Sequence, residues 1–150
     1  MKNPDNILGE LQMVVKHETC KGKPQKPTPR LRKLLVRAHR IFEKEYPDTD
    51  VAIKYLFFKS EDVQRLGREF GKNRRCAMSI YGRHEHIVIF DIDLDKMPDD
   101  FILFNFLHEF IHAGFEETDE AKAISMTFDV MKGLGVDRDD FMRRYRHWLV

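Results

Sequence analysis

The chain has 150 residues, of which 42% are hydrophobic and 34% are charged, and its 26 lysines and arginines nearly balance 25 aspartates and glutamates. This composition predicts one folded domain over residues 1–150 and excludes a chain that is disordered throughout. No apolar run approaches the ~18 residues of a membrane span, and the N-terminus lacks a secretory signal pattern. We therefore expect a cytoplasmic protein without membrane contact. The cysteines at positions 20 and 76 stand apart, which predicts neither a disulfide nor a cysteine-based zinc site.

The charges are segregated along the chain. The segment that begins at Lys16 and ends at Arg40 carries nine basic residues and one acid, whereas residues 85–129 carry twelve acids and two lysines. The basic segment could neutralise nucleic-acid phosphates, although it lacks interleaved aromatic residues and matches no reader motif. The simpler interpretation is that the two segments face water or each other.

The first half of the chain opens with an amphipathic pattern over residues 7–15 and a Lys-, Gly- and Pro-rich stretch up to residue 27. Residues 1–27 are therefore expected to form an N-terminal helix and a basic linker. A helix is predicted from Thr28-Pro29, a threonine cap followed by proline in the first helical position, as far as Tyr46.

The central part predicts strands. Residues 51–58 are β-branched and aromatic, and residues 76–81 and 86–92 are two further strand-like runs joined by a predicted hairpin turn over residues 82–85. A short helix over residues 61–70, capped by Ser60, separates the first strand from this hairpin.

The last third is predicted to be helical, with helices from Pro98 to about Ala113, from a Thr118 cap to Lys132, and from Asp137 to near Trp148. The expected fold is α+β. It combines a small, mostly antiparallel three-stranded sheet with a helical subdomain that carries a metal.

The expected metal site follows from the sequence His108-Glu109-Phe-Ile-His112 in the first of these helices. Histidines four residues apart project from one face of a helix and can bind one metal ion, while Glu109 can reach a water on that ion. Zinc would lower the pKa of the water, and Glu109 would act as general base.

The alternative for this motif is a pair of core histidines that bind neighbouring backbone or acidic groups. The helix is apolar nearly all round, which predicts that it lies at the buried centre of the fold. Buried histidines and a buried glutamate need strong partners, and one metal ion can serve all three side chains. The context therefore favours the metal site.

The third ligand should come from the acids that follow the motif. If Gly114 ends the first helix and Thr118 caps the next, Glu120 lies in the first turn of the second helix, opposite His112. Glu120 is the favoured ligand and Glu116, in the connecting loop, is its main rival. Ordinary helix-end electrostatics accounts for Glu117 and Asp119.

The motif together with Asp119-Glu120-Ala121 resembles the gluzincin metallopeptidases, in particular minigluzincins and ImmA/IrrE-type peptidases. The resemblance covers about a third of the chain, and it implies a zincin-like fold with zinc bound by His108, His112 and Glu120. It also implies a peptide or protein substrate that binds along a sheet edge. The segment after Glu120 lacks the Asn and the Leu-x-Pro ending typical of the ImmA/IrrE type.

Other metal sites are disfavoured. The metzincin pattern needs Gly and His where this chain has Phe115 and Thr118, and a di-iron bundle needs a second Glu-x-x-His. Asp91, Asp93 and Asp95 resemble the start of a calcium loop, but the required glycine and glutamate are missing, so we interpret them as the end of a strand and the entry to a helix.

The sequence thus predicts a zinc-dependent peptidase, and the alternative is an inactive or regulatory zinc protein that associates with nucleic acid. A peptidase also needs a group that stabilises the oxyanion. The candidates, among which the sequence does not choose, are Tyr81, His84, Tyr145 and His147.

Overall fold

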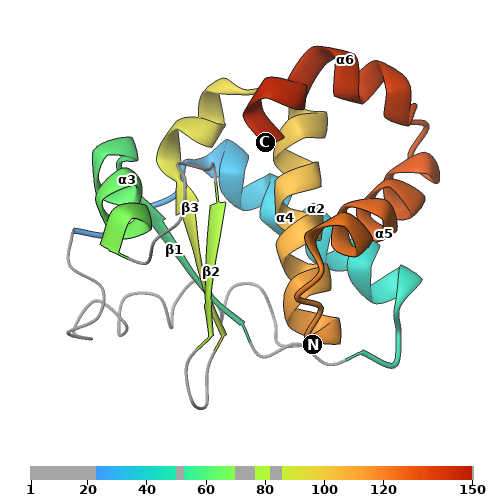
Figure 1. The fold of residues 1–150 in the computed structure, drawn as a ribbon, viewed down its shortest axis with the longest axis horizontal. Coiled ribbons are helices and arrows are strands. Elements are labelled where there is room, and N and C mark those ends of the chain that lie inside the picture. Colours follow the sequence, from blue (N-terminus) through green and yellow to red (C-terminus); the bar gives the residue numbers. More distant parts are fainter. Residues whose placement is uncertain (1–22, 50–52, 70–76, 82–85, 150) are drawn as a thin grey trace.

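The computed structural model describes residues 23–49, 53–69, 77–81 and 86–149. A small sheet has one helix, residues 60–69, on one side and most of the other helices on the opposite side (Figure 1). The helix expected over residues 7–15, both cysteines and His84 lie outside the described residues. Among the residues that are described, no helix is both long and apolar enough to cross a membrane.

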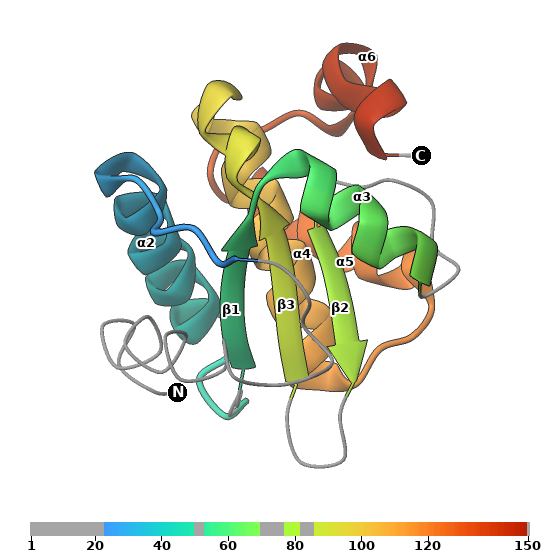
Figure 2. The same cartoon turned by 90° about the vertical axis from the view of Figure 1, so that its left-hand side faces the viewer.

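The sheet has three strands in the order β1-β3-β2 (Figure 2), formed by Ile53–Phe58 (β1), Ala77–Tyr81 (β2) and His86–Asp91 (β3). The strand β3 lies in the centre, and it pairs antiparallel with β2 and parallel with β1. The expectation of a mostly antiparallel sheet is therefore wrong, because the longer of the two pairings is parallel.

The hairpin between β2 and β3 was predictable because its strands are neighbours in sequence, and their antiparallel pairing confirms the prediction. The orientation of β1 was not predictable in this way. The helix α3 (Ser60–Glu69) and then β2 lie between β1 and its partner. The chain therefore forms β2 before it forms β3, the strand that pairs with β1. No local sequence pattern indicates whether that pairing is parallel or antiparallel.

The helix α2 (Pro29–Glu45) begins where its cap predicts, because the Thr28 hydroxyl accepts a hydrogen bond from the Leu31 amide. It buries an apolar stripe and leaves its lysine and arginine side chains exposed, which are Arg30, Arg32, Lys33, Arg37, Arg40 and Lys44. Arg30 donates to Asp99 at 2.7 Å and to the Asp95 carbonyl at 2.5 Å. At this point the basic segment faces the acidic segment of the same chain.

The helix α4 (Asp99–Phe115) is the centre of the fold, and every residue from 101 to 112 is buried. It lies behind the sheet and between α2 and α5 (Figure 2). Phe106 packs on the strands, Phe110 packs on α2 and on Tyr55, and Phe104 packs on Phe128 of α5. The prediction of a central buried helix is confirmed.

The turn after α4 differs from the prediction. The helix continues through Gly114 to Phe115, and its C-cap, Glu116, has the left-handed backbone conformation at φ 49° and ψ 36°. The next helix, α5 (Glu120–Lys132), is capped by Asp119 instead of Thr118, because the Asp119 carboxylate accepts hydrogen bonds from the amides of Ala121 and Lys122. The last helix is α6 (Arg138–Leu149).

Candidate metal centre

Two histidine side chains project from α4 toward α5. The four-residue spacing of His108 and His112 places their Nε2 atoms 3.1 Å apart, with the two rings nearly perpendicular. Both histidines are buried. The helical spacing alone therefore produces the close pair that the sequence predicts.

The third side chain of this group comes from the first turn of α5. Glu120 Oε1 lies 2.6 Å from Nε2 of His108, and Oε2 lies 3.1 Å from Nε2 of His112. The Glu120 side chain is 46% exposed, whereas the two histidine side chains are 10% and 8% exposed. The group is thus buried on its α4 side and reachable from solvent on its α5 side.

The protonation of His112 is fixed by its backbone partner. The Nδ1 atom of His112 contacts the carbonyl oxygen of Glu117. A carbonyl oxygen can only accept a hydrogen bond, so Nδ1 carries the proton. The Nε2 atom of a neutral His112 would then direct a lone pair at the Glu120 carboxylate, and this arrangement needs a cation between the two groups.

A proton at this position stabilises the pair in the absence of a metal. Burial lowers the pKa of His112, but the hydrogen bonds to Glu120 and to the Glu117 carbonyl outweigh burial, and the pKa is raised overall. The hydrogen bonds from His108 and His112 hold the pKa of Glu120 well below its usual range. A positive charge between the histidines and Glu120, whether a proton or a metal ion, is therefore favourable.

The donor atoms fit a metal ion. The ligand atoms of His108, His112 and Glu120 all lie within 4.8 Å of one another. Tetrahedral ligands bound at the usual zinc distances are separated by about 3.3 Å, close to the separations of 2.6 to 3.1 Å found here. The three side chains therefore form a group that could hold a metal ion.

Glu109 lies beside this group on the same helix and is buried. Successive helical residues are separated by about 100° around the axis, so Glu109 points between the side of α4 that carries the histidines and the side that faces the sheet. Its charge helps to raise the pKa of His112. After burial, it is also the second cause that raises the pKa of Tyr55 on β1. Its carboxylate thus lies within electrostatic reach of both the histidines and the sheet.

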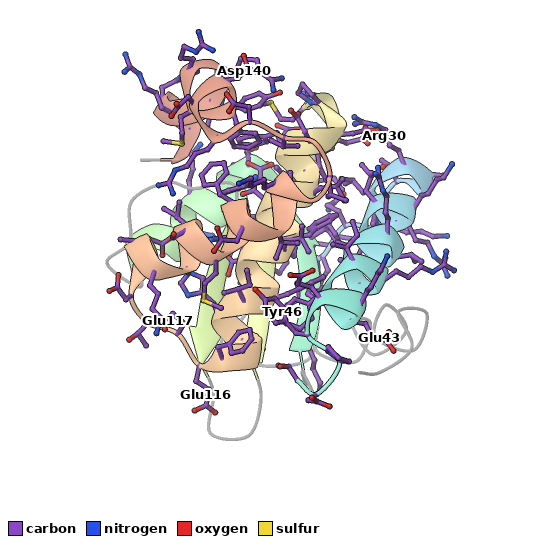
Figure 3. The ribbon with its side chains drawn as sticks, turned by 90° about the vertical axis from the view of Figure 1, so that its right-hand side faces the viewer. Arg30, Glu43, Tyr46, Glu116, Glu117 and Asp140 are labelled. Atoms are coloured by element: carbon purple, nitrogen blue, oxygen red, sulfur yellow. The ribbon has the colours of Figure 1, made fainter. Side chains whose placement is uncertain are left out.

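The other acids near the turn have different roles. Figure 3 shows Glu116 and Glu117 at the end of α4 and in the loop that leads to α5. Glu116 is the exposed C-cap of α4 and does not join the group of His108, His112 and Glu120. Glu117 forms an ion pair with Lys122 at 3.0 Å. The interpretation of Asp119 as a helix-end acid is confirmed by its cap.

The candidate oxyanion residues do not gather at this group. The Tyr145 hydroxyl donates to Asp100, at the opposite end of α4 from His112, and its ring packs on Phe101. His147 is exposed and packs beside Trp148. The side chain of Tyr81, like all of His84, lies outside the described part of the structure. Among the described side chains, neither candidate on α6 joins the group of His108, His112 and Glu120.

The aspartates that resemble a calcium loop serve as structural hydrogen-bond acceptors. Asp91 ends β3, and its carboxylate accepts from Ser60 Oγ at 2.6 Å and from the amide of Asp93 at 2.8 Å. Asp95 accepts from Thr28 Oγ1 at 2.9 Å. These contacts confirm a strand end followed by a short helical entry, the 3₁₀ turn η1 (Ile92–Lys96).

Two neighbours of the histidines were not found from sequence. One is the Glu117 carbonyl, which as a backbone group has no sequence signal. The other is Thr127, whose Oγ1 lies 3.4 Å from Nδ1 of His108. The sequence feature that could have revealed Thr127 is its spacing of seven residues from Glu120, which places both side chains on one face of α5.

Comparisons of the chain with protein-family models, with curated proteins and with solved structures find no match. The resemblance to gluzincins therefore rests on the motif and the ligand group alone.

Proposed function

We propose that the protein is a zinc-dependent metallopeptidase of the gluzincin type. The observation that carries the proposal is the convergence of His108, His112 and Glu120, from two helices, on one small volume beside Glu109. The core histidine alternative requires only that each ring bind a neighbouring backbone or acidic group. The metal site is favoured because both Nε2 atoms converge on one carboxylate from the neighbouring helix, so one ion can contact all three groups.

Two imidazoles and one carboxylate form a donor set that favours zinc, and catalytic zinc sites use three protein ligands of this kind. Bound zinc supplies a water of lowered pKa and polarises the carbonyl of the substrate. His108, His112 and Glu120 would hold the ion. The exposed side of Glu120 gives the route by which water and substrate approach.

Glu109 is proposed as the general base. Its carboxylate accepts a proton from the attacking water and passes it to the leaving amine. Burial restricts the motion of this carboxylate, and its place between the histidine side and the sheet side of α4 keeps it within electrostatic reach of His112. The proposed role rests on this position in the helix.

The proposed substrate is an extended peptide. Among the described strands, β2 pairs on one side only, and it also contacts α4. A peptide can add to such an edge through main-chain hydrogen bonds. This placement would bring a peptide bond toward the end of α4 that carries the histidines.

The test compares zinc content and cleavage of a mixed peptide library by the wild type and by Glu109→Gln. We expect one zinc per chain in both proteins, and a loss of cleavage of at least ~100-fold in the variant, as for removal of a general base. Glu116→Gln is the matched control and should retain activity. If the wild type binds zinc but cleaves no peptide, the inactive or regulatory alternative replaces the proposal.

A further inference from the structure

Thr127 is a buried polar residue on the face of α5 that packs against α4. Its side chain is fully buried. The hydroxyl donates to the carbonyl of Ala123 at 2.7 Å, and Oγ1 lies 3.4 Å from Nδ1 of His108. The residue therefore connects the backbone of α5 to one of the proposed metal ligands.

The direction of these two bonds follows from the single hydroxyl proton. Because that proton is directed to the Ala123 carbonyl, Oγ1 has only lone pairs to offer to His108. The Nδ1 atom of His108 must then be the donor. In the neutral ring, Nε2 would then direct a lone pair toward Glu120 and His112, the position of a shared proton or of the proposed ion.

The same tautomer results at His112 from a different acceptor, the Glu117 carbonyl. Both rings thus carry a proton on Nδ1 and direct Nε2 toward the proposed ion. Histidine ligands commonly donate their second N–H to an oxygen acceptor, which fixes the ring orientation and raises the basicity of the ligand. The two acceptors belong to α5 and to the loop before it.

We propose that Thr127 is a positioning residue that holds His108 in the metal-binding tautomer and orientation. This inference rests on the proposed zinc site. Glu120 and Thr127 are seven residues apart, about two turns, and so lie on one face of α5. A single helix thus presents both a ligand and the acceptor that orients a second ligand. Phe104 supports the same orientation, because its ring lies nearly parallel to the His108 ring, with 5.7 Å between the ring centroids.

The test uses Thr127→Val, which removes the hydroxyl but keeps the shape, and Thr127→Ser, which keeps the hydroxyl. Zinc titration should show affinity about 10- to 100-fold weaker for Thr127→Val, the usual cost of losing such an acceptor. Thr127→Ser should restore affinity to near the wild-type value. The matched control is Thr118→Val, at an exposed threonine, which should bind zinc as the wild type does.

A second readout separates positioning from loss of structure. Long-range ¹⁵N–¹H NMR is measured on the zinc-free protein in a Glu120→Ala background, which removes the carboxylate that competes for a proton on Nε2 of His108. With the ring neutral, His108 should be protonated on Nδ1 when residue 127 is Thr and in Thr127→Ser. A mixture of tautomers is expected in Thr127→Val. If Thr127→Val does not fold, Thr127→Ala takes its place in both measurements.

Wild-type affinity together with an unchanged tautomer in Thr127→Val would overturn the role of Thr127 and leave the zinc site intact. If the wild type binds no zinc, the proposed function fails and the role of Thr127 as a positioning residue for a ligand fails with it. The tautomer measurement would then still report whether the hydrogen bond to His108 exists.

Discussion

Nε2 of His108 lies 2.6 Å from Oε1 of Glu120, although the two residues belong to different helices. Their distance depends on the turn over residues 116–119, because this turn sets where α5 begins relative to α4. Glu116 ends the first helix with a left-handed backbone, and Asp119 caps the second. The geometry of the group therefore depends on Glu116 and Asp119.

Removal of the Asp119 cap should destabilise α5. Asp119→Ala leaves the amides of Ala121 and Lys122 without their side-chain acceptor, and we expect a loss of about 1 kcal/mol in the free energy of unfolding. Asp119→Asn and Asp119→Ser are controls that can still cap and should lose much less. Urea denaturation measures all three. Equal stability of Asp119→Ala and the wild type would show that this cap contributes nothing.

Relief of the left-handed conformation at Glu116 should stabilise the protein. A left-handed backbone is unfavourable for a residue with a Cβ atom and easy for glycine, so Glu116→Gly should raise the free energy of unfolding by about 0.5 to 1 kcal/mol. Glu116→Ala keeps the penalty and serves as the control. A loss of stability in Glu116→Gly relative to Glu116→Ala, measured by urea denaturation, would contradict the assignment.

Much of the turn could not be predicted from sequence. Gly114 and Thr118 are the residues that propensity selects for a helix end and a helix cap, yet neither has that role. Tertiary packing determines where α4 ends instead. Phe115, the last residue of α4, packs on Tyr46, the C-cap of α2, with 4.9 Å between the ring centroids, and this long-range contact favours extension of the helix past the glycine. The prediction that Glu120 lies in the first turn of α5 nevertheless holds, because shifting the cap to Asp119 leaves Glu120 in that turn.

The buried His39 should make stability depend on pH. Burial lowers the pKa of His39 to about 4, from an ordinary value of 6.5. Between these pH values the unfolded chain binds more protons than the folded protein. The contribution of neutral His39 to the free energy of unfolding is therefore complete above about pH 6.5 and is lost as the pH falls to 4. A shift of this size corresponds to at most about 3 kcal/mol.

The measurement is urea denaturation of the wild type and of His39→Phe at several pH values between 4 and 7, a range set by the same shift in pKa. Phenylalanine can keep the ring contacts with Tyr55 and Phe110. We expect the wild type to lose more stability than the variant as the pH falls. Parallel pH profiles for the two proteins would show that His39 does not contribute.

Truncation of Phe110 should be severe. Its ring is fully buried and packs on His39, Phe42 and Tyr55, so it joins α4 to both α2 and the sheet. Phe110→Ala should cost about 3 to 5 kcal/mol. Phe115→Ala, on the same helix but with the residue 39% exposed, should cost clearly less. Thermal or urea unfolding compares the two, and equal losses would contradict the central place of Phe110.

The ligand group shows which parts of a site local sequence can reveal. The spacing of His108 and His112 is a property of one helix and was therefore predictable. Glu120 required the approach of a second helix, which the short connection made a reasonable expectation. The Glu117 carbonyl and the orientation of β1 depend on tertiary structure, and no residue pattern predicts them.

The most direct test of the central claim is a calorimetric titration of zinc into the wild type, Glu120→Gln and Glu116→Gln. The account predicts one zinc per wild-type chain and an unchanged affinity for Glu116→Gln. Glu120→Gln should bind at least ~10-fold more weakly, since loss of a ligand should cost no less than loss of an outer-shell partner. A wild-type protein that binds no zinc, or equal affinity in all three proteins, would contradict the assignment of His108, His112 and Glu120 as the ligands.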